Sequence, residues 1–184
     1  AYPIAKNLKI PFITSVHGRL RNQNIFKNYY NSILVKGDLI IAISNHIREN
    51  IIKVFPKVKK KVHIVYRGVD LENFNLENIS DTRIVNQAKK LGFHDYKPTI
   101  IMASRPKKWK GHLILIEALS KVNVEFQCFL IGALDGDNKF KNEIYKNINK
   151  FNLGNKIKLT NSTNDIQSAF TLGDIVVMPS IDPE

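Results

Sequence analysis

Two cations close to a predicted helix start are the most informative residues in this sequence. Arg105 and Lys110 lie in the segment 104–111, which follows a buried apolar strand and leads into a helix. The first turn of a helix has free N–H groups and a partial positive charge, so two added cations there could hold a diphosphate. The same spacing also fits an ordinary solvated basic loop, and the residues alone leave both interpretations open.

Other phosphate-binding and metal-binding patterns receive less support. The chain contains neither G-x-x-x-x-G-K-[ST] nor G-x-G-x-x-G, which argues against ATP hydrolysis and ordinary dinucleotide binding. Asp135 and Asp137 form an Asp-x-Asp pair that could hold a metal–nucleotide complex. Because Asp, Gly and Asn are also common turn residues, a plain turn is the alternative for this segment. An EF-hand is rejected, since its required glycine and glutamate are not correctly placed.

Polar residues also follow the other predicted strands. His17 follows the first strand and could be catalytic or belong to a plain turn, whereas Ser44 follows the second strand and is expected to cap a helix. The basic run at 57–61 is expected to be a solvated turn, because a nucleic-acid site would interleave aromatic residues. Ligands bind beyond the carboxyl ends of the strands in open parallel sheets, so these positions should gather at one edge of each sheet.

The elements that must position these residues alternate between short apolar strands and longer helices. Strands are predicted at 11–16, 38–43, 62–66, 99–103, 126–131, 156–159 and 174–178. Helices are predicted at 25–36, 45–55, 81–91, 112–121, 139–151 and 165–172. A polar stretch at 70–81 separates the two runs and is expected to be a linker. Continuous apolar strands alternating with helices predict two α/β units, each with a parallel sheet covered on both faces.

Composition sets the class of protein and of partner. Of the 184 residues, 43% are hydrophobic and 24% are charged, which predicts a packed core. The formal net charge of +12 favours anionic partners, namely nucleotide phosphates, anionic lipid surfaces or nucleic acid. Codon bias toward Lys in AT-rich DNA would produce part of the same excess. The lone cysteine, Cys128, is expected to be a buried structural thiol, which fits a cytoplasmic protein.

The start of the sequence suggests a piece of a longer chain. The first residues lack the features of a signal peptide and an initiating Met, so we expect the start to be a cut. No apolar run is long enough to span a membrane.

Taken in order, the strand-end motifs resemble those of the retaining glycosyltransferases of GT-B fold, family 4. The similar segments are TSVHG at 14–18, DLIIAIS at 38–44, VYRGVD at 65–70, ASRPKKWKG at 103–111, the Asp-Gly turn after 130–132 and PSIDPE at 179–184. They cover nearly the whole chain, and their order makes the resemblance specific. Arg67 departs from the Asn that the family often has, and the turn before Asp135 is lengthened.

The resemblance implies an α/β fold with two Rossmann-like parallel-sheet units, each incomplete in this chain. Residues 1–75 would be the C-terminal part of the acceptor-side domain with its linker. Residues 76–184 would be the N-terminal part of the donor-nucleotide-binding domain. The chain would therefore straddle the cleft between the two domains and stop within the family's Glu-x7-Glu motif, so the fragment alone is expected to be inactive.

The resemblance also implies roles for residues at the matching positions. Arg105 and Lys110 would contact the donor diphosphate, and Glu184 would hold hydroxyls of the donor sugar. His17 would come from the acceptor side and lie near the transferred sugar, while Gly18 would let the backbone approach the donor. The catalytic set would be His17, Arg105, Lys110 and Glu184. The donor-binding set would be Gly18, Arg105, Lys110, Gly111 and Glu184.

The implied activity is transfer of a hexose from a nucleotide-sugar to a saccharide or lipid-linked acceptor, with retention of configuration. Fixed cations would stabilise the leaving diphosphate without a metal, and no cofactor is implied. Such an enzyme would act in bacterial cell-envelope or lipopolysaccharide synthesis, in the cytoplasm, with docking on the inner face of an anionic membrane suggested by the net charge. Two alternatives stay open: a catalytically inactive remnant or binding module of the same fold, and a nucleic-acid-binding α/β protein, for which no recognition motif is present.

Overall fold

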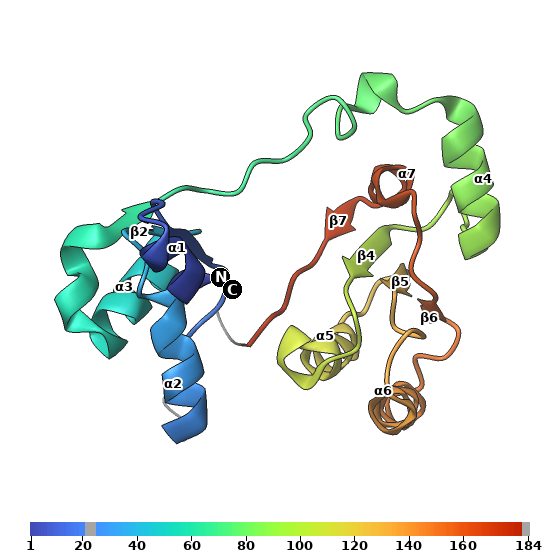
Figure 1. Ribbon diagram of the computed structural model, residues 1–184. Coiled ribbons are helices and arrows are strands. Elements are labelled where there is room, and N and C mark those ends of the chain that lie inside the picture. Colours follow the sequence, from blue (N-terminus) through green and yellow to red (C-terminus); the bar gives the residue numbers. More distant parts are fainter. Residues whose placement is uncertain (21–24, 182–184) are drawn as a thin grey trace. The chain divides into compact units, whose positions relative to one another are not determined.

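The computed structural model describes residues 1–20 and 25–181, without the side chains of residues 25–28. The described residues form two compact units. Residues 1–69 make up the first unit, and the second unit begins at residue 70. Each unit has its own sheet (Figure 1).

The first unit is a three-stranded parallel sheet with order β1-β2-β3. Its elements are α1 (Tyr2–Asn7), β1 (Ile13–Val16), α2 (Ile25–Leu34), β2 (Leu39–Ala42), α3 (Asn45–Val54), the 3-10 helix η1 (Pro56–Lys61) and β3 (Val62–Ile64). Ile47 and Ile51 of α3 pack on Ile40 of the central strand. Ser44 caps α3 as predicted, because its hydroxyl accepts a hydrogen bond from the Ile47 amide at 3.2 Å.

The second unit contains a four-stranded parallel sheet with order β6-β5-β4-β7. Its elements are η2 (Leu76–Asn78), α4 (Asp81–Leu91), β4 (Thr99–Ala103), η3 (Lys108–Lys110), α5 (His112–Leu119), β5 (Gln127–Ile131), α6 (Asn138–Lys150), β6 (Ile157–Thr160), α7 (Ile166–Thr171) and β7 (Ile175–Val176). The two sheets confirm the predicted α/β class with parallel strands.

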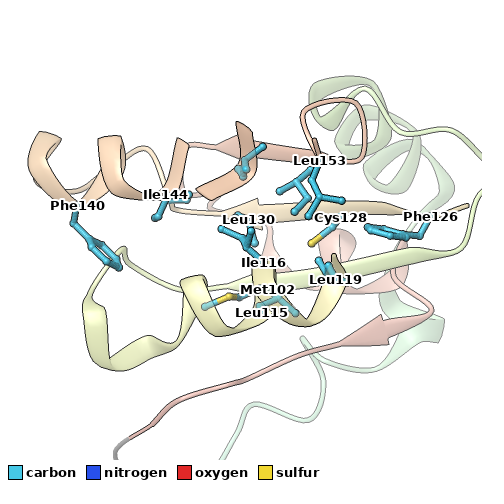
Figure 2. Packing of buried hydrophobic residues seen from close by; sticks show 13 residues of the cluster. Met102, Leu115, Ile116, Leu119, Phe126, Cys128, Leu130, Phe140, Ile144 and Leu153 are labelled. Atoms are coloured by element: carbon cyan, nitrogen blue, oxygen red, sulfur yellow. The ribbon is translucent and has the colours of Figure 1, made fainter. Parts of the chain in front are cut away.

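The central strands β4 and β5 of the second sheet are buried on both faces, as their continuous apolar sequences predicted, whereas Ile175 and Val176 of the edge strand β7 are exposed. Cys128 and Leu130 of β5 point to one face, where they pack with side chains of α5 and α6 (Figure 2). Phe129, between them in sequence, packs on the opposite face with residues of α4 and α7. This alternation is the ordinary pleat of a strand with two apolar faces. Cys128 is a buried free thiol, as expected, and burial raises its pKa to about 12.

The strands β1, β2, β3, β5 and β7 are shorter than predicted. At the starts of β1 and β7 the reason is the same. Pro11 has no amide hydrogen, and the amide of Phe12 donates to the carboxylate of Asp38 at 2.9 Å, so the β1 ladder begins only at Ile13. At β7, the carboxylate of Asp174 accepts from the amide of Thr99 at 2.7 Å. Side chains therefore take the backbone partners that a longer ladder would have used. Helix α1 was not predicted, because six residues give too little periodicity.

Candidate functional site

The loop between β4 and α5 carries both predicted diphosphate ligands. It closes with the single turn η3, in which the amide of Lys110 donates to the carbonyl oxygen of Lys107 at 2.9 Å. Gly111 follows with φ of 80° and is the N-cap residue of α5. Arg105 is exposed at the start of this loop, whereas Lys110 is half-buried at its end. The two cations therefore flank a loop that leads directly into the N-terminus of α5.

A close backbone contact joins this loop to the segment after β7. A Cβ atom on Gly111 would lie 1.9 Å from the carbonyl oxygen of Pro179, so only glycine allows this approach. The amide of Ile181 donates to the carbonyl oxygen of Trp109 at 2.9 Å. Lys110 lines the small hollow between the two segments, and its Nζ lies 4.3 Å from the centre of the Trp109 ring. Arg105 does not line this hollow.

The turn after β5 packs against the same loop. A Cβ atom on Gly136 would lie 2.0 Å from Cγ of Pro106, so the turn needs glycine for this contact. The carboxylate of Asp135 accepts from the amide of Ser162 at 2.7 Å, and that of Asp137 accepts from the first turn of α6 at 3.1 Å. Both carboxylates thus accept hydrogen bonds from backbone amides, as residues of a plain turn do. No group of three or more His, Cys, Asp or Glu side chains within residues 1–20 and 25–181 could hold a metal ion.

A hollow of about 600 Å³ lies beyond the carboxyl end of β6, beside α4. Its polar lining includes Gln87, Lys90, Thr160, Asn161, Ser162 and Thr163. The contact between Asp135 and Ser162 fixes one wall of this hollow relative to the loop of Lys110. A single turn, the one after β5 that contains Asp135, therefore connects this hollow to the loop of the predicted diphosphate ligands.

The other wall of this hollow is fixed by an ion pair. Arg83 of α4 makes two hydrogen bonds to the carboxylate of Asp165, at 3.0 and 2.7 Å. Asp165 also accepts from the amide of Ser168 at the start of α7. The Arg83 guanidinium holds the pKa of Asp165 well below its usual range, so this carboxylate stays ionised and keeps α4 in place. No local sequence pattern predicts this pair, because its members lie 82 residues apart.

His112 also belongs to this site, although no motif predicted it. It is 1% exposed in the first turn of α5, and its ring meets Phe140 edge-on with 6.0 Å between ring centres. Its Nε2 lies 3.5 Å from the hydroxyl of Ser104, while its Nδ1 is buried without a partner among the described residues. Burial lowers the pKa of His112, so the imidazole is neutral behind the Lys110 loop. Its position directly after Gly111 was the available signal.

In the first unit, His17 and Arg67 come together at the carboxyl edge of the sheet. They follow β1 and β3, the two strands on either side of β2, and Nη2 of Arg67 lies 2.5 Å from Nδ1 of His17. A guanidinium can only donate, so Nδ1 accepts and the ring proton of neutral His17 is on Nε2. In this pair His17 offers a hydrogen-bond donor rather than a base.

The remaining predicted residues divide between the open edge and the undescribed end of the chain. A Cβ atom on Gly18 would meet nothing within 4 Å, so packing within the unit does not require glycine there. Glu184 lies outside the described residues. A further hollow of about 460 Å³, lined by Tyr2, Lys6 and Phe12 among others, is at the amino edge of the first sheet, away from His17.

Two family models match the chain. Residues 1–73 match the model described as Glycosyltransferase Family 4. Residues 84–184, more than half of the chain, match the model described as Glycosyl transferases group 1.

A curated glycosyltransferase is similar to this chain over most of its length. It is the N-acetylgalactosamine-N,N'-diacetylbacillosaminyl-diphospho-undecaprenol 4-alpha-N-acetylgalactosaminyltransferase of Campylobacter jejuni, which is 25% identical over 148 residues. The match covers 78% of this chain and 36% of the relative, so the chain spans about a third of the relative's length.

Solved structures resemble the whole chain. A glycosyltransferase from Rickettsia africae ESF-5 is 29% identical with a TM-score of 0.83, and the match covers 99% of this chain and 54% of that structure. Anabaena Alr3699/HepE, solved in complex with UDP and glucose, is 23% identical with a TM-score of 0.83, over 98% of this chain and 49% of that structure. These likenesses show that the two parallel sheets are parts of a GT-B fold.

Proposed function

The chain belongs to the group 1 glycosyl transferases, and we propose that it serves transfer of a hexose from a nucleotide-sugar to a saccharide or lipid-linked acceptor, with retention of configuration. The observation that carries this proposal is the placement of Lys110. The contact between Gly111 and Pro179 holds the Lys110 loop against the segment after β7, at the N-terminus of α5. A cation and free helix amides at one point are suited to the diphosphate of such a donor.

The proposed chemistry follows from where charge develops. Breaking the bond between sugar and phosphate builds negative charge on the leaving nucleoside diphosphate. Groups that are already fixed in place stabilise this charge more in the transition state than in the ground state. Lys110 is the fixed cation, because its loop is tied to two neighbouring segments. The exposed Arg105 would close on the diphosphate when the donor binds, and the proposed transfer requires no metal.

We assign the hollow beyond β6 to the nucleoside of the donor. Its hydroxyl and amide groups at Thr160 and Asn161 can hydrogen-bond a base or ribose, and its volume of about 600 Å³ suits a small molecule. The bond from Ser162 to Asp135 joins this hollow to the turn that packs on the Lys110 loop. A nucleoside in the hollow would thus have its phosphates directed along the sheet edge toward Lys110.

The acceptor side of the proposal rests on the first unit. His17 presents an Nε2–H donor that suits a sugar hydroxyl, and the space at Gly18 leaves room for the approach of a ligand. A lipid-linked acceptor is supported by the relative from Campylobacter jejuni, whose name includes a diphospho-undecaprenol. This acceptor class suggests work in the cytoplasm at the inner face of a membrane. None of the described helices is both long and apolar enough to cross a membrane.

A thermal-shift screen against UDP-, GDP-, ADP- and CMP-sugars tests donor binding. We expect the nucleotide-sugars of one base to raise the melting temperature, because a ligand that binds only the folded state stabilises it. Lys110→Ala should remove most of that shift. Lys107→Ala, which removes an exposed lysine of the same loop, should retain it. The proposal fails if no nucleotide-sugar stabilises the wild-type chain, or if both variants respond like the wild type.

A further inference from the structure

The positive charge of this protein is concentrated in one of its two units. Residues 1–69 contain 13 Lys and Arg against two Asp and Glu, a balance of +11. From residue 70 onward the chain contains 15 Lys and Arg against 14 Asp and Glu, a balance of +1. Codon bias acts along the whole sequence, so it does not explain why acidic residues are nearly missing from one unit only.

Within the first unit, the lysines occupy one edge of the sheet. Helices α2 and α3 return from the carboxyl ends of β1 and β2, so their C-terminal ends and η1 come to the amino edge. We call this surface the lysine edge; its exposed members are Lys6, Lys9, Lys36, Lys53, Lys57, Lys59, Lys60 and Lys61. The described arginines Arg19, Arg48 and Arg67 lie toward the opposite edge, where His17 is found.

Contacts between elements make the lysine edge one continuous surface. Nζ of Lys61, at the end of η1, donates to the carbonyl oxygen of Gly37 at 3.3 Å. The adjacent Lys36 places its Nζ 5.5 Å from the ring centre of Tyr29 and 5.7 Å from that of Tyr2. The edge therefore runs from η1 across the α2–β2 loop to α1, with tyrosine rings among the ammonium groups.

Within η1, three lysines of the lysine edge have no neutralising partner among the described residues. Lys57, Lys59 and Lys60 form no ion pair with any described residue. Some lysines of the second unit are paired: Lys97 and Lys156 both lie within 4 Å of the carboxylate of Glu125, at 3.5 and 3.3 Å. Unpaired like charges at neighbouring positions repel one another, so an anionic partner would relieve a cost that the fold alone leaves in place.

The form of this surface favours a membrane over a nucleic acid. Lysine ammonium groups act as point charges without the planar fork of arginine, and the lysine run at 53–61 contains one aromatic residue, Phe55, which packs against the core. Tyr29 and Tyr30 are 67% and 66% exposed beside the edge. Tyrosine is enriched at the level of lipid head groups, where lysines are attracted to anionic lipids.

We propose that the lysine edge docks on an anionic phospholipid surface. Docking at the amino edge leaves the opposite edge, with His17 and Arg67, free of the lipid surface. The inference rests on the proposed function only for its biological purpose, which is to bring the protein to a lipid-linked acceptor. The binding itself needs no donor and no transfer.

Flotation with vesicles tests the docking surface. Phosphatidylcholine vesicles with and without phosphatidylglycerol are mixed with the wild-type chain, with Lys57→Glu/Lys59→Glu/Lys60→Glu, and with the control Lys89→Glu/Lys139→Glu/Lys146→Glu. The control reverses three exposed lysines of the second unit and changes the net charge equally. Each lysine near an anionic surface contributes about 1 kcal/mol, so the lysine-edge variant should partition at least about 100-fold more weakly. The wild type and the control should both float with the anionic vesicles.

The outcomes separate the docking surface from its alternatives. Equal loss in both variants would show a net-charge effect and overturn the proposal, as would binding of the wild type to both kinds of vesicle alike. Salt-sensitive binding of an oligonucleotide without flotation would replace the membrane by a nucleic acid. Circular dichroism checks the fold, and Lys57→Gln/Lys59→Gln/Lys60→Gln provides a milder variant with a smaller expected loss. Donor-induced thermal shifts in the lysine-edge variant show whether the donor site stands independently.

Discussion

The two units share one strand–helix alternation but hold their carboxyl edges in different ways. In the second unit, loops from neighbouring strands interlock through the Gly111–Pro179 contact and the bond from Ser162 to Asp135. In the first unit, the edge carries the exposed pair of His17 and Arg67, and nothing surrounds the Cβ position of Gly18. The same alternation of strands and helices thus supports a preformed edge in one unit and an open edge in the other.

Charge follows the same division. The second unit nearly balances its charges and pairs several of them, whereas the first unit carries +11 with few carboxylates. A preformed, balanced edge is suited to holding a small anion in a defined geometry, because its dipoles are fixed in advance. An open and strongly basic unit is suited to a large, diffuse anionic partner. The following predictions test this contrast, from the largest expected effect to the smallest.

The largest effect is expected at Lys110. In an active protein that contains this chain, Lys110→Ala should lower the transfer rate by about 10²–10³-fold, because one fixed cation at the leaving diphosphate is lost. Steady-state turnover with the donor found by thermal shift measures this. Lys107→Ala is the matched control and should leave the rate nearly unchanged. Near-normal turnover of Lys110→Ala would contradict a preformed anion site.

Substituting one glycine at each carboxyl edge compares how tightly the two edges are packed. Gly111→Ala should lower the free energy of unfolding by about 2–4 kcal/mol, because φ is 80° and the new Cβ would meet the Pro179 carbonyl. Gly18→Ala should change it by about 0.5 kcal/mol or less, since its Cβ position is open. Urea unfolding of the two variants measures both values. Equal destabilisation would show that the edges do not differ in packing.

Acidification should weaken the second unit through His112. Burial lowers the pKa of this imidazole, whereas the unfolded chain binds a proton as the pH falls through 6.5. Unfolding is therefore favoured progressively below that pH, by up to about 1.4 kcal/mol per pH unit. Urea unfolding followed by Trp109 fluorescence measures the slope, and His112→Gln should reduce it. The exposed His94→Gln is the control, and an unchanged slope in His112→Gln would refute the assignment.

Salt should produce the smallest change, and in the first unit only. Added NaCl screens the repulsion among unpaired lysines and so stabilises the first unit. The free energy of local opening in residues 1–69 should rise by a few tenths of a kcal/mol, and amide exchange there should slow accordingly. Amides from residue 70 onward should respond weakly, because their charges are balanced. Hydrogen exchange resolved by residue measures both regions in one sample. A uniform response along the chain would remove the electrostatic contrast.

Much of the fold could be predicted because it is encoded locally. Continuous apolar runs indicated the strands, and Ser44 indicated the start of α3, because burial and helix capping depend on nearby residues. The position of Arg105 and Lys110 between a strand and a helix was also evident, and it is confirmed. Their role in donor binding stays a prediction. Strand ends were less predictable, because Asp38 and Asp174 capture backbone amides from elsewhere in the chain.

The sequence by itself determined two parallel α/β units, a basic loop before a helix and an unequal distribution of charge. Only the tertiary structure decided that Gly111 meets Pro179, that Asp135 holds Ser162 and that Arg67 donates to His17. Periodicity records which side of a strand or helix is buried, but it does not record which strands become neighbours. The sheet orders β1-β2-β3 and β6-β5-β4-β7 bring distant loops together, and those loops form the candidate site.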